Sequence, residues 1–168
     1  DENTGVPPLF MYLVAGAFTL LGRTVWALRL TSAGVGVLGL LVSYLLLREL
    51  LGRRVALITL AGLTVSFWHL FDSRVGIEPI IVPLTTALSF YLFWQALRRG
   101  SLRWYTLAGL SMGLAQYGHR SGPLVPLVAG LFMLYLLATR HAWLQGEGQR
   151  ISRRRALLGL GLMLAIAA

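Results

Sequence analysis

Two short polar turns interrupt the long apolar stretches of this chain, at residues 68–79 and 116–123. Their ionisable side chains are His69, Asp72, Arg74, Glu78, His119 and Arg120. Guanidinium groups bind phosphate well, because their planar fork donates two parallel hydrogen bonds. A carboxylate beside them can accept a proton as a general base or bind a divalent metal ion. The two turns therefore predict a polar site in which a phosphate group and a proton acceptor lie together.

Each of these side chains also has a purely structural interpretation. Asp72 and Arg74 could form a solvated pair, and Glu78 could begin a helix, since acidic side chains are favourable in a first helical turn. His69 lies one helical turn inside an apolar stretch, where a hydrogen-bonded packing role is the more common one. The histidine and the arginine of the second turn could simply mark a membrane interface.

Two common motifs for binding metal or phosphate are absent from the sequence. The sequence has no HExxH metal motif and no phosphate-binding loop. It has no cysteine, which excludes a disulfide framework, a thiolate metal site and a cysteine nucleophile.

The composition indicates that membrane helices position the two turns. Of the 168 residues, 57% are hydrophobic and 12% are charged, and the mean hydropathy is +0.72, whereas soluble domains carry about 25% charged residues. A membrane helix needs about 20 apolar residues. Charge-free apolar stretches occupy residues 30–47, 55–71, 79–97, 104–117 and 121–139, and a sixth, 156–168, is cut short by the end of the sequence. We expect an all-α polytopic bundle with about five complete spans and a truncated sixth.

A shorter apolar stretch, residues 7–22, opens with two prolines and ends in Gly22. Proline is favourable in a first helical turn and glycine is a common helix stop. We expect a juxtamembrane helix that lies in the membrane interface. Residues 1–29 would be an outer loop, and 30–168 the transmembrane part, of a single membrane domain fragment (1–168) that lacks an upstream span and a C-terminal remainder.

The arginines of alternate loops predict the orientation. Eleven of the fifteen arginines lie in three such loops: Arg48, Arg53 and Arg54; Arg98, Arg99 and Arg103; Arg140, Arg150, Arg153, Arg154 and Arg155. Basic loops face the cytoplasm. We therefore expect a multi-pass protein of the plasma (inner) membrane, in contact with membrane lipids, whose two polar turns face away from the cytoplasm. This distribution explains the net charge of +9 without nucleic-acid binding.

Three further stretches carry a family resemblance. Residues 2–13 (ENTGVPPLFMYL) resemble the (H/R)(P/E)PL(Y/F)xYL segment of bacterial membrane glycosyltransferases of the GT-C fold, which are related to protein O-mannosyltransferase and to the aminoarabinose transferase of lipid A. Residues 48–56 (RELLGRRVA) look like a cytoplasmic turn of those proteins, and Ser73-Arg74 with Glu78 looks like their next outer turn. The resemblance covers about residues 2–125.

The resemblance implies a glycosyltransferase that moves a sugar from a polyprenyl-phosphate donor to an acceptor outside the cytoplasm, with inversion at the anomeric carbon. Glu2 and Glu78 are then the candidate catalytic carboxylates, and a divalent metal ion is a possible cofactor. Arg74 and Arg120 are candidate phosphate ligands. The remaining candidates for substrate binding are His119 and Asp72.

Two positions depart from the family pattern. The family's principal catalytic acid lies further upstream than Glu2, and Val6 replaces the usual His or Arg before the first proline. We therefore expect the fragment to be inactive by itself.

Two other functions fit the same residues. A transporter or flippase for a lipid-linked glycan would use helices broken in mid-membrane, for which Pro83 and Pro126 are candidates. A membrane anchor without a site would point its charged side chains apart, into water.

Overall fold

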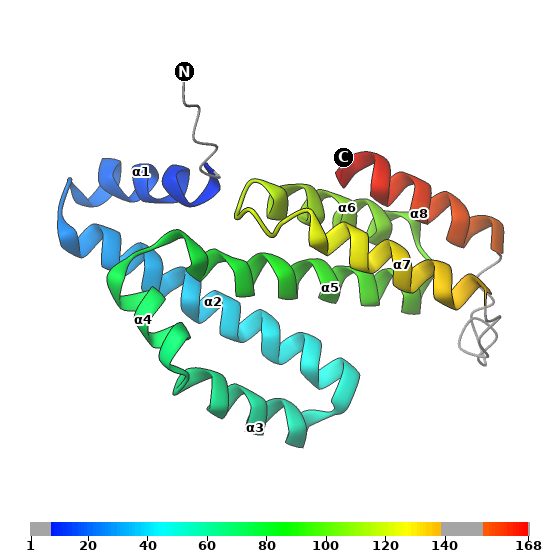
Figure 1. Ribbon diagram of the computed structural model, residues 1–168, viewed down its shortest axis with the longest axis horizontal. Helices are drawn as coiled ribbons and strands as arrows, with labels where there is room; N and C mark the ends of the chain where they lie inside the picture. The colour runs from blue at the N-terminus through cyan, green and yellow to red at the C-terminus, as the bar shows by residue number, and fades with distance from the viewer. Residues whose placement is uncertain (1–7, 139–152, 168) are drawn as a thin grey trace.

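The computed structural model describes residues 8–138 and 153–167, and its regular elements are helices (Figure 1). They are α1 (Leu9–Leu21), α2 (Val25–Leu51), α3 (Arg53–Thr64), α4 (Phe67–Val75), the short 3-10 helix η1 (Glu78–Ile80), α5 (Ile81–Arg99), α6 (Leu102–Gln116), α7 (Leu124–Ala138) and α8 (Arg153–Ala167). No strand occurs among the described residues. The predicted all-α class is confirmed.

The longest helix, α2, has a clear signal at each end. The side chain of Thr24 accepts a hydrogen bond from the Ala27 N–H (3.2 Å), and the chain leaves the helix at Gly52 with φ +85°, which glycine adopts without steric cost. The 27 residues of α2 extend about 40 Å at 1.5 Å per residue. This length exceeds the hydrocarbon core of a bilayer, which is about 30 Å thick.

Within the described residues, two segments are long and apolar enough to cross a membrane: α2 and the continuous helix η1–α5. A third candidate is the pair α3 and α4, whose axes are bent by 56°. The helices α6 and α7 have 15 residues each and reach about 22 Å. The predicted number of five complete spans stays a prediction.

The bend between α3 and α4 corrects the straight span predicted for residues 55–71. The Thr64 hydroxyl donates to the Ala61 carbonyl (2.7 Å), and Ser66 is extended with φ −62° and ψ 129°. Threonine, valine and serine occur in succession here, and all three favour helix interiors less than alanine or leucine do. The helix resumes as α4, so most of the stretch predicted to be a polar turn is helical.

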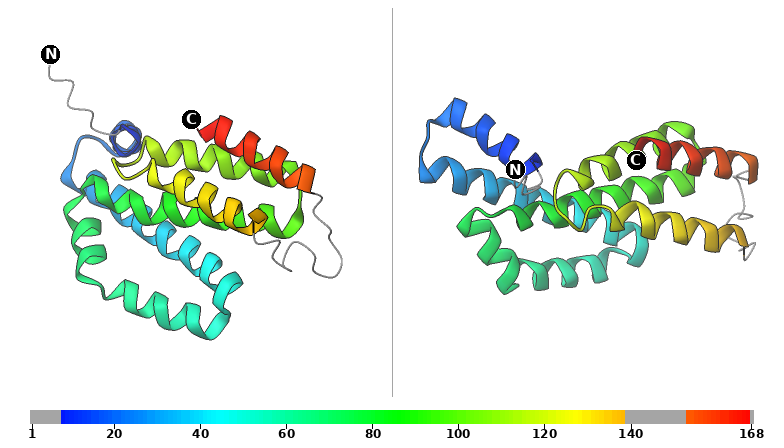
Figure 2. Two further views of the ribbon diagram at one scale, coloured as in Figure 1. Left: turned by 45° about the vertical axis from the view of Figure 1, so that its right-hand side comes forward. Right: turned by 45° about the horizontal axis from the view of Figure 1, so that its top comes forward.

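The helix predicted for residues 7–22 is confirmed as α1, which ends at Gly22 with φ +79°. Its buried side chains, Phe10 and Val14, pack with Val35 of α2 and with Ile80 and Ile81. In the left view of Figure 2, α1 is seen nearly end-on while α5, α6 and α7 run across the page. The helix α1 therefore crosses the direction of the bundle, as an interfacial helix would, although its place in the interface stays a prediction.

The helices α5 to α8 share one core. Its buried residues are Phe93, Ala96, Leu97, Tyr105, Ala108, Met112, Ala115, Val125, Ala129, Met133, Leu136 and Met163. A Cβ at Gly109 would lie 2.7 Å from the Met163 carbonyl oxygen, so this glycine lets α6 and α8 approach closely. Pro83 and Pro126 lie in the first turns of α5 and α7, where proline is tolerated, and break neither helix.

The turns of the bundle fall at two ends. The turns α2–α3 and α5–α6 lie at one end, and the turns α4–α5 and α6–α7 lie at the other, next to α1 (Figure 1). An ion pair between Arg98 and Glu49 joins the two turns of the first end. Two of the three predicted arginine-rich connections therefore lie at one end; residues 139–152 of the third lie outside the described residues, and the cytoplasmic side stays a prediction. We call these the arginine-rich end and the α1 end.

Candidate functional site

At the α1 end, α4 packs against α2 near Gly36. A Cβ at Gly36 would come to 3.5 Å from both His69 Nε2 and Ser73 Cβ. Further along α2, a Cβ at Gly39 would lie 3.3 Å from the backbone nitrogen of Leu84. A Cβ at Gly36 would also lie 3.3 Å from Ile80 Cδ1, so the tight contacts of these two glycines are to residues 80–84.

Two sequence patterns that are typical of soluble enzymes lie within helices, where they do not form the turns that their function requires. Residues 34–39 have the form GxGxxG, and residues 109–113 have the form GxSxG. A dinucleotide loop and a nucleophile elbow both need a turn between a strand and a helix, whereas these segments lie within α2 and α6. Ser111, the serine of the second pattern, is buried and shares a hydrogen bond with Ser89 (3.0 Å).

The C-terminus of α4 places Glu78 at the start of the next helix. α4 ends at Gly76, whose φ of +84° is left-handed and whose N–H donates to the Asp72 carbonyl (3.2 Å). After this reversal η1 begins at Glu78, followed by Pro79. Glu78 therefore lies in a first helical turn, as its structural interpretation predicts.

Two cavities flank α4. The arginine cavity, of about 530 Å³, is formed by the first turns of α2 and the last turn of α4, and its lining residues are Trp26, Arg29, Leu30, Ala33, Ser73, Arg74 and Val75. The aspartate cavity, of about 180 Å³, lies against the middle of α2 and the start of α5, and its polar lining residues are Ser43, Ser66, His69 and Asp72. Asp72 and Arg74 therefore line different cavities.

Arg29 was not among the candidate residues predicted from the sequence. Arg29 lies inside α2, one turn from its N-terminus, and lines the same cavity as Arg74. The available signal was a charged residue one helical turn inside an apolar helix. His69 was expected to be a packing residue, and it packs against Gly36 while also lining the aspartate cavity.

The turn between α6 and α7 fixes the ring of His119. Its Nδ1 accepts a hydrogen bond from the Ser121 N–H (3.1 Å) and lies 2.8 Å from the Ser121 hydroxyl. A backbone N–H can only donate, so Nδ1 carries the lone pair and the neutral ring carries its proton on Nε2. The free edge of His119 is therefore a hydrogen-bond donor.

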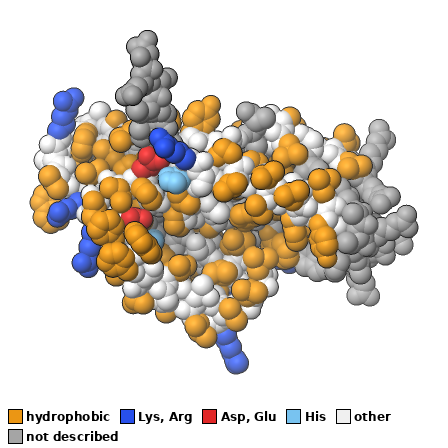
Figure 3. All heavy atoms as spheres, in the orientation of Figure 1, with side chains coloured by type: hydrophobic (Ala, Val, Ile, Leu, Met, Phe, Trp, Pro, Cys, Tyr) orange, Lys and Arg blue, Asp and Glu red, His pale blue; other side chains and the backbone are white. Residues whose placement is uncertain are grey.

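This turn contacts the starts of α1 and α5. The Leu9 N–H donates to the Tyr117 carbonyl (3.0 Å), and a Cβ at Gly118 would lie 3.4 Å from Ile81 Cγ2. Since Ile81 follows Glu78 by three residues, the turn and Glu78 share one end of the bundle. Figure 3 shows acidic, basic and histidine side chains gathered at this end, beside the start of α1.

The candidate side chains are not paired with one another. In the described part of the chain, both ion pairs involve Glu49, at the arginine-rich end. Asp72 and Glu78 are half-buried, and Arg74 and Arg120 are exposed. The solvated Asp72–Arg74 pair is therefore absent.

The described residues offer no group of three or more His, Asp or Glu side chains that could hold a metal ion. Candidate metal ligands are consequently not gathered at this end within residues 8–138 and 153–167.

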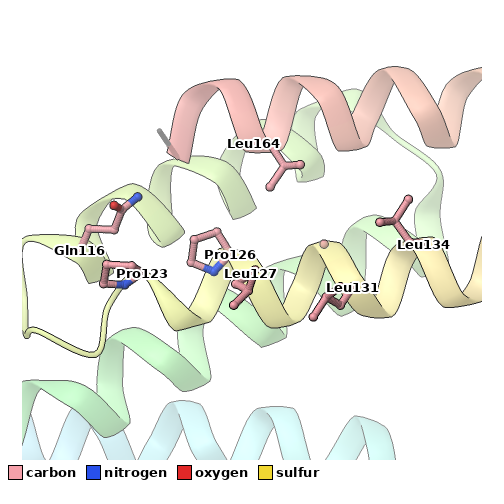
Figure 4. Close-up of a pocket in the computed structure, with 8 residues that line it drawn as sticks. Gln116, Pro123, Pro126, Leu127, Leu131, Leu134 and Leu164 are labelled. Carbon is pink, nitrogen blue, oxygen red and sulfur yellow. The ribbon is translucent and has the colours of Figure 1, made fainter.

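An apolar groove runs along α7 from the same end (Figure 4). It has a volume of about 480 Å³, and its lining residues are Gln116, Pro123, Pro126, Leu127, Gly130, Leu131, Leu134 and Leu164. Gln116 and Pro123 lie at the end nearest the α6–α7 turn, and the leucines extend away from it. The groove suits a flexible hydrocarbon chain.

A model of the dolichyl-phosphate-mannose-protein mannosyltransferase family matches residues 5–168. The chain belongs to this family. Comparison with curated proteins and with solved structures gives no match. The resemblance to GT-C glycosyltransferases noted in the sequence is confirmed.

Membership of the mannosyltransferase family implies a membrane glycosyltransferase that uses a lipid-linked sugar donor. The apolar helices agree with a membrane location. The candidate catalytic residue Glu2 lies outside the described residues. The described chain begins at Pro8. The next residue, Leu9, donates its N–H to the α6–α7 turn.

Proposed function

We propose that the chain transfers a sugar from a polyprenyl-phosphate-linked donor to an acceptor on the non-cytoplasmic side of the membrane. Family membership supports the reaction class. The gathering of candidate residues at the α1 end, away from the arginine-rich turns, supports the side, because basic loops face the cytoplasm. The membrane would be the plasma (inner) membrane.

The proposed reaction is a single displacement. The acceptor hydroxyl attacks the anomeric carbon from the side opposite the phosphate, so the new glycosidic bond forms as the carbon–oxygen bond to phosphate breaks, with inversion. The hydroxyl proton passes to a carboxylate, for which Glu78 and Glu2 are the candidates. Polyprenyl phosphate leaves with the bonding electron pair.

Arg120 and Arg74 are the proposed phosphate ligands, since guanidinium groups offset the negative charge that develops on the leaving phosphate. The Nε2–H of His119 is free to donate to an acceptor oxygen, given that Ser121 holds Nδ1. Asp72 would accept hydrogen bonds from sugar hydroxyls. The apolar groove along α7 would hold part of the isoprenoid chain.

The observation that carries this proposal is the pairing state of the carboxylates. Glu49 is ion-paired with Arg48 and Arg98, whereas Asp72 and Glu78 make no ion pair within the described residues. An ion pair with a guanidinium group lowers the basicity of a carboxylate, so an unpaired carboxylate is the better proton acceptor. The free carboxylates lie at the α1 end.

The test is sugar transfer from a radiolabelled polyprenyl-phosphate sugar by the full-length protein. We expect Glu78→Gln to abolish most of the transfer and the matched variant Glu49→Gln to retain it. Transfer at the wild-type rate by Glu78→Gln would remove the catalytic assignment of Glu78.

A further inference from the structure

The α6–α7 turn holds the backbone of Arg120, a candidate phosphate ligand, in one conformation. The Gly122 N–H donates to the His119 carbonyl (2.8 Å), which closes a turn with Arg120 and Ser121 as its central residues. A Cβ at Gly122 would collide with the Ala115 carbonyl oxygen, so the turn packs tightly on the end of α6. The backbone that carries Arg120 therefore has little room to move.

The imidazole ring of His119 makes a second link across this turn. Its Nδ1 accepts a hydrogen bond from the Ser121 N–H (3.1 Å), two residues further along the chain. Asparagine and aspartate side chains stabilise turns by the same type of link. Because the lone pair of Nδ1 is used in this bond, the δ nitrogen serves the turn. Arg120 is the residue that both hydrogen bonds enclose.

The side chain of Arg120 has no comparable support. It is exposed, and both ion pairs within residues 8–138 and 153–167 involve Glu49 instead. A flexible side chain loses conformational freedom when it binds a ligand, and the total cost of ordering is smaller when its backbone is already fixed. The turn is therefore the part of the protein that prepares Arg120 for a phosphate.

We propose that His119 is a positioning residue for Arg120, and that sugar transfer requires its Nδ1 more than its Nε2–H. The ring closes the turn, the turn holds the backbone of Arg120, and the guanidinium of Arg120 binds the donor phosphate. The inference rests on the proposed function, in which Arg120 is a phosphate ligand. Positioning has a large effect on rate, because a displacement of about 1 Å can cost about 100-fold.

Two substitutions separate the two nitrogens of the His119 ring. His119→Asn places an amide oxygen near the position of Nδ1, where it can accept from the Ser121 N–H, but it provides no group at the position of Nε2. His119→Gln places its amide group near the position of Nε2 and has no acceptor at the δ position. The measured quantity is kcat/KM of the full-length protein for the polyprenyl-phosphate sugar.

We expect His119→Asn to keep kcat/KM within about threefold of the wild-type value and His119→Gln to lower it about tenfold. In a protein that already carries Arg120→Gln, His119→Gln should lower kcat/KM by less than about twofold. Residues that act through one another show such non-additivity. A role of His119 in stability alone would give the same loss in both backgrounds.

The opposite order, with His119→Gln close to wild type and His119→Asn impaired, would overturn the proposal and assign the role to Nε2–H. Additive losses in the double variant would also overturn it, since His119 would then act without Arg120.

A second measurement needs no sugar transfer. In the full-length protein labelled with ¹⁵N-histidine, the NMR signals of His119 are identified by their loss in His119→Asn. At mildly alkaline pH they should show an unprotonated Nδ1 and a protonated Nε2, and a proton on Nδ1 would contradict the proposal. If the wild-type protein shows this tautomer but transfers no sugar, the result counts against the proposed function and not against the link between His119 and the turn.

Discussion

The charged residues at the two ends of the bundle differ in their interactions. At the arginine-rich end Glu49 is ion-paired with Arg48 and Arg98. Arg99 donates to the side chain of Gln95 (3.3 Å), and its guanidinium carbon lies 4.4 Å from the centroid of the Trp104 ring. At the α1 end, none of the described arginines or carboxylates has a comparable partner in the described residues.

This difference distinguishes charged side chains that stabilise the fold through ion pairs from charged side chains that are free to bind a ligand. Pairs such as Arg98 and Glu49 connect helices across a turn and neutralise each other. Unpaired charged side chains beside cavities can still form hydrogen bonds with a ligand. The residues Arg53, Arg54 and Arg103 are exposed and unpaired too, but they line neither of the cavities beside α4. The unpaired charged residues that line a cavity are Arg29, Arg74 and Asp72, all at the α1 end, whereas Glu78 and Arg120 lie at that end without lining either cavity.

The largest expected effect comes from exchanging one carboxylate at each end for its amide. Glu78→Gln should lower transfer by about 10²–10⁴-fold, because the amide cannot accept the acceptor proton. Glu49→Gln should leave transfer within about twofold, since Glu49 serves only the structure. Initial rates at saturating donor, measured on the full-length protein, compare the two. A similar loss in both variants would contradict the distinction between the ends.

A smaller loss is expected from the arginines. Arg120→Gln should reduce transfer by about 10–100-fold, because a hydrogen bond to a charged group contributes about 1.5–3 kcal/mol. Arg103→Gln is the matched control at the other end and should have little effect. The readout is kcat/KM for the lipid donor. If the two variants lose activity equally, Arg120 has no special role at the phosphate.

The position of α4 should matter by about tenfold. Gly36→Val forces a side chain toward His69 and Ser73, displacing α4 and with it Arg74. Gly34→Val puts the same side chain two residues away, where a Cβ meets no atom within 4 Å. Transfer and thermal unfolding are measured for both. Equal behaviour of the two variants would show that the packing of α4 against α2 does not position the site.

The smallest effect concerns the ion pair itself. Arg98→Gln should lower the free energy of unfolding by no more than about 1 kcal/mol, because exposed ion pairs contribute little; the Arg98 side chain is 50% exposed. Transfer should not change. Denaturant unfolding in mild detergent provides the measurement. A stability loss of several kcal/mol would mean that this end is held by its charges more than by its apolar core.

The sequence predicts the helices of this fold well, because lipid leaves a spanning chain few alternatives. The apolar stretch 7–22 corresponds to α1, and the stretch 79–97 lies within the continuous helix Glu78–Arg99. Gly22 also ends α1 where the sequence predicts it. In each case the signal is local, so neighbouring residues suffice to find it.

The features that sequence reasoning missed depend on contacts between distant residues. Arg29 and Arg74 line one cavity because the end of α4 lies against the start of α2, where a Cβ at Gly76 would lie 2.8 Å from Leu28 Cγ. The bend at Thr64–Ser66 arises in a segment without proline, and Gly62 with the three residues 64–66 gives only a weak propensity signal for it. Neither feature is marked by a residue spacing that can be recognised in a single sequence.

The central claim is that the two polar segments of the α1 end face the same side of the membrane, opposite the arginine-rich turns. Because these 168 residues contain no cysteine, single cysteines introduced into them can be labelled in sealed vesicles with a membrane-impermeant maleimide, in a full-length protein from which any other cysteine has been removed. Suitable exposed positions are Val75, Pro123 and Leu102. We predict that Val75→Cys and Pro123→Cys react from the non-cytoplasmic side and Leu102→Cys only from the cytoplasmic side. Labelling of Val75→Cys and Pro123→Cys from opposite sides would contradict the account.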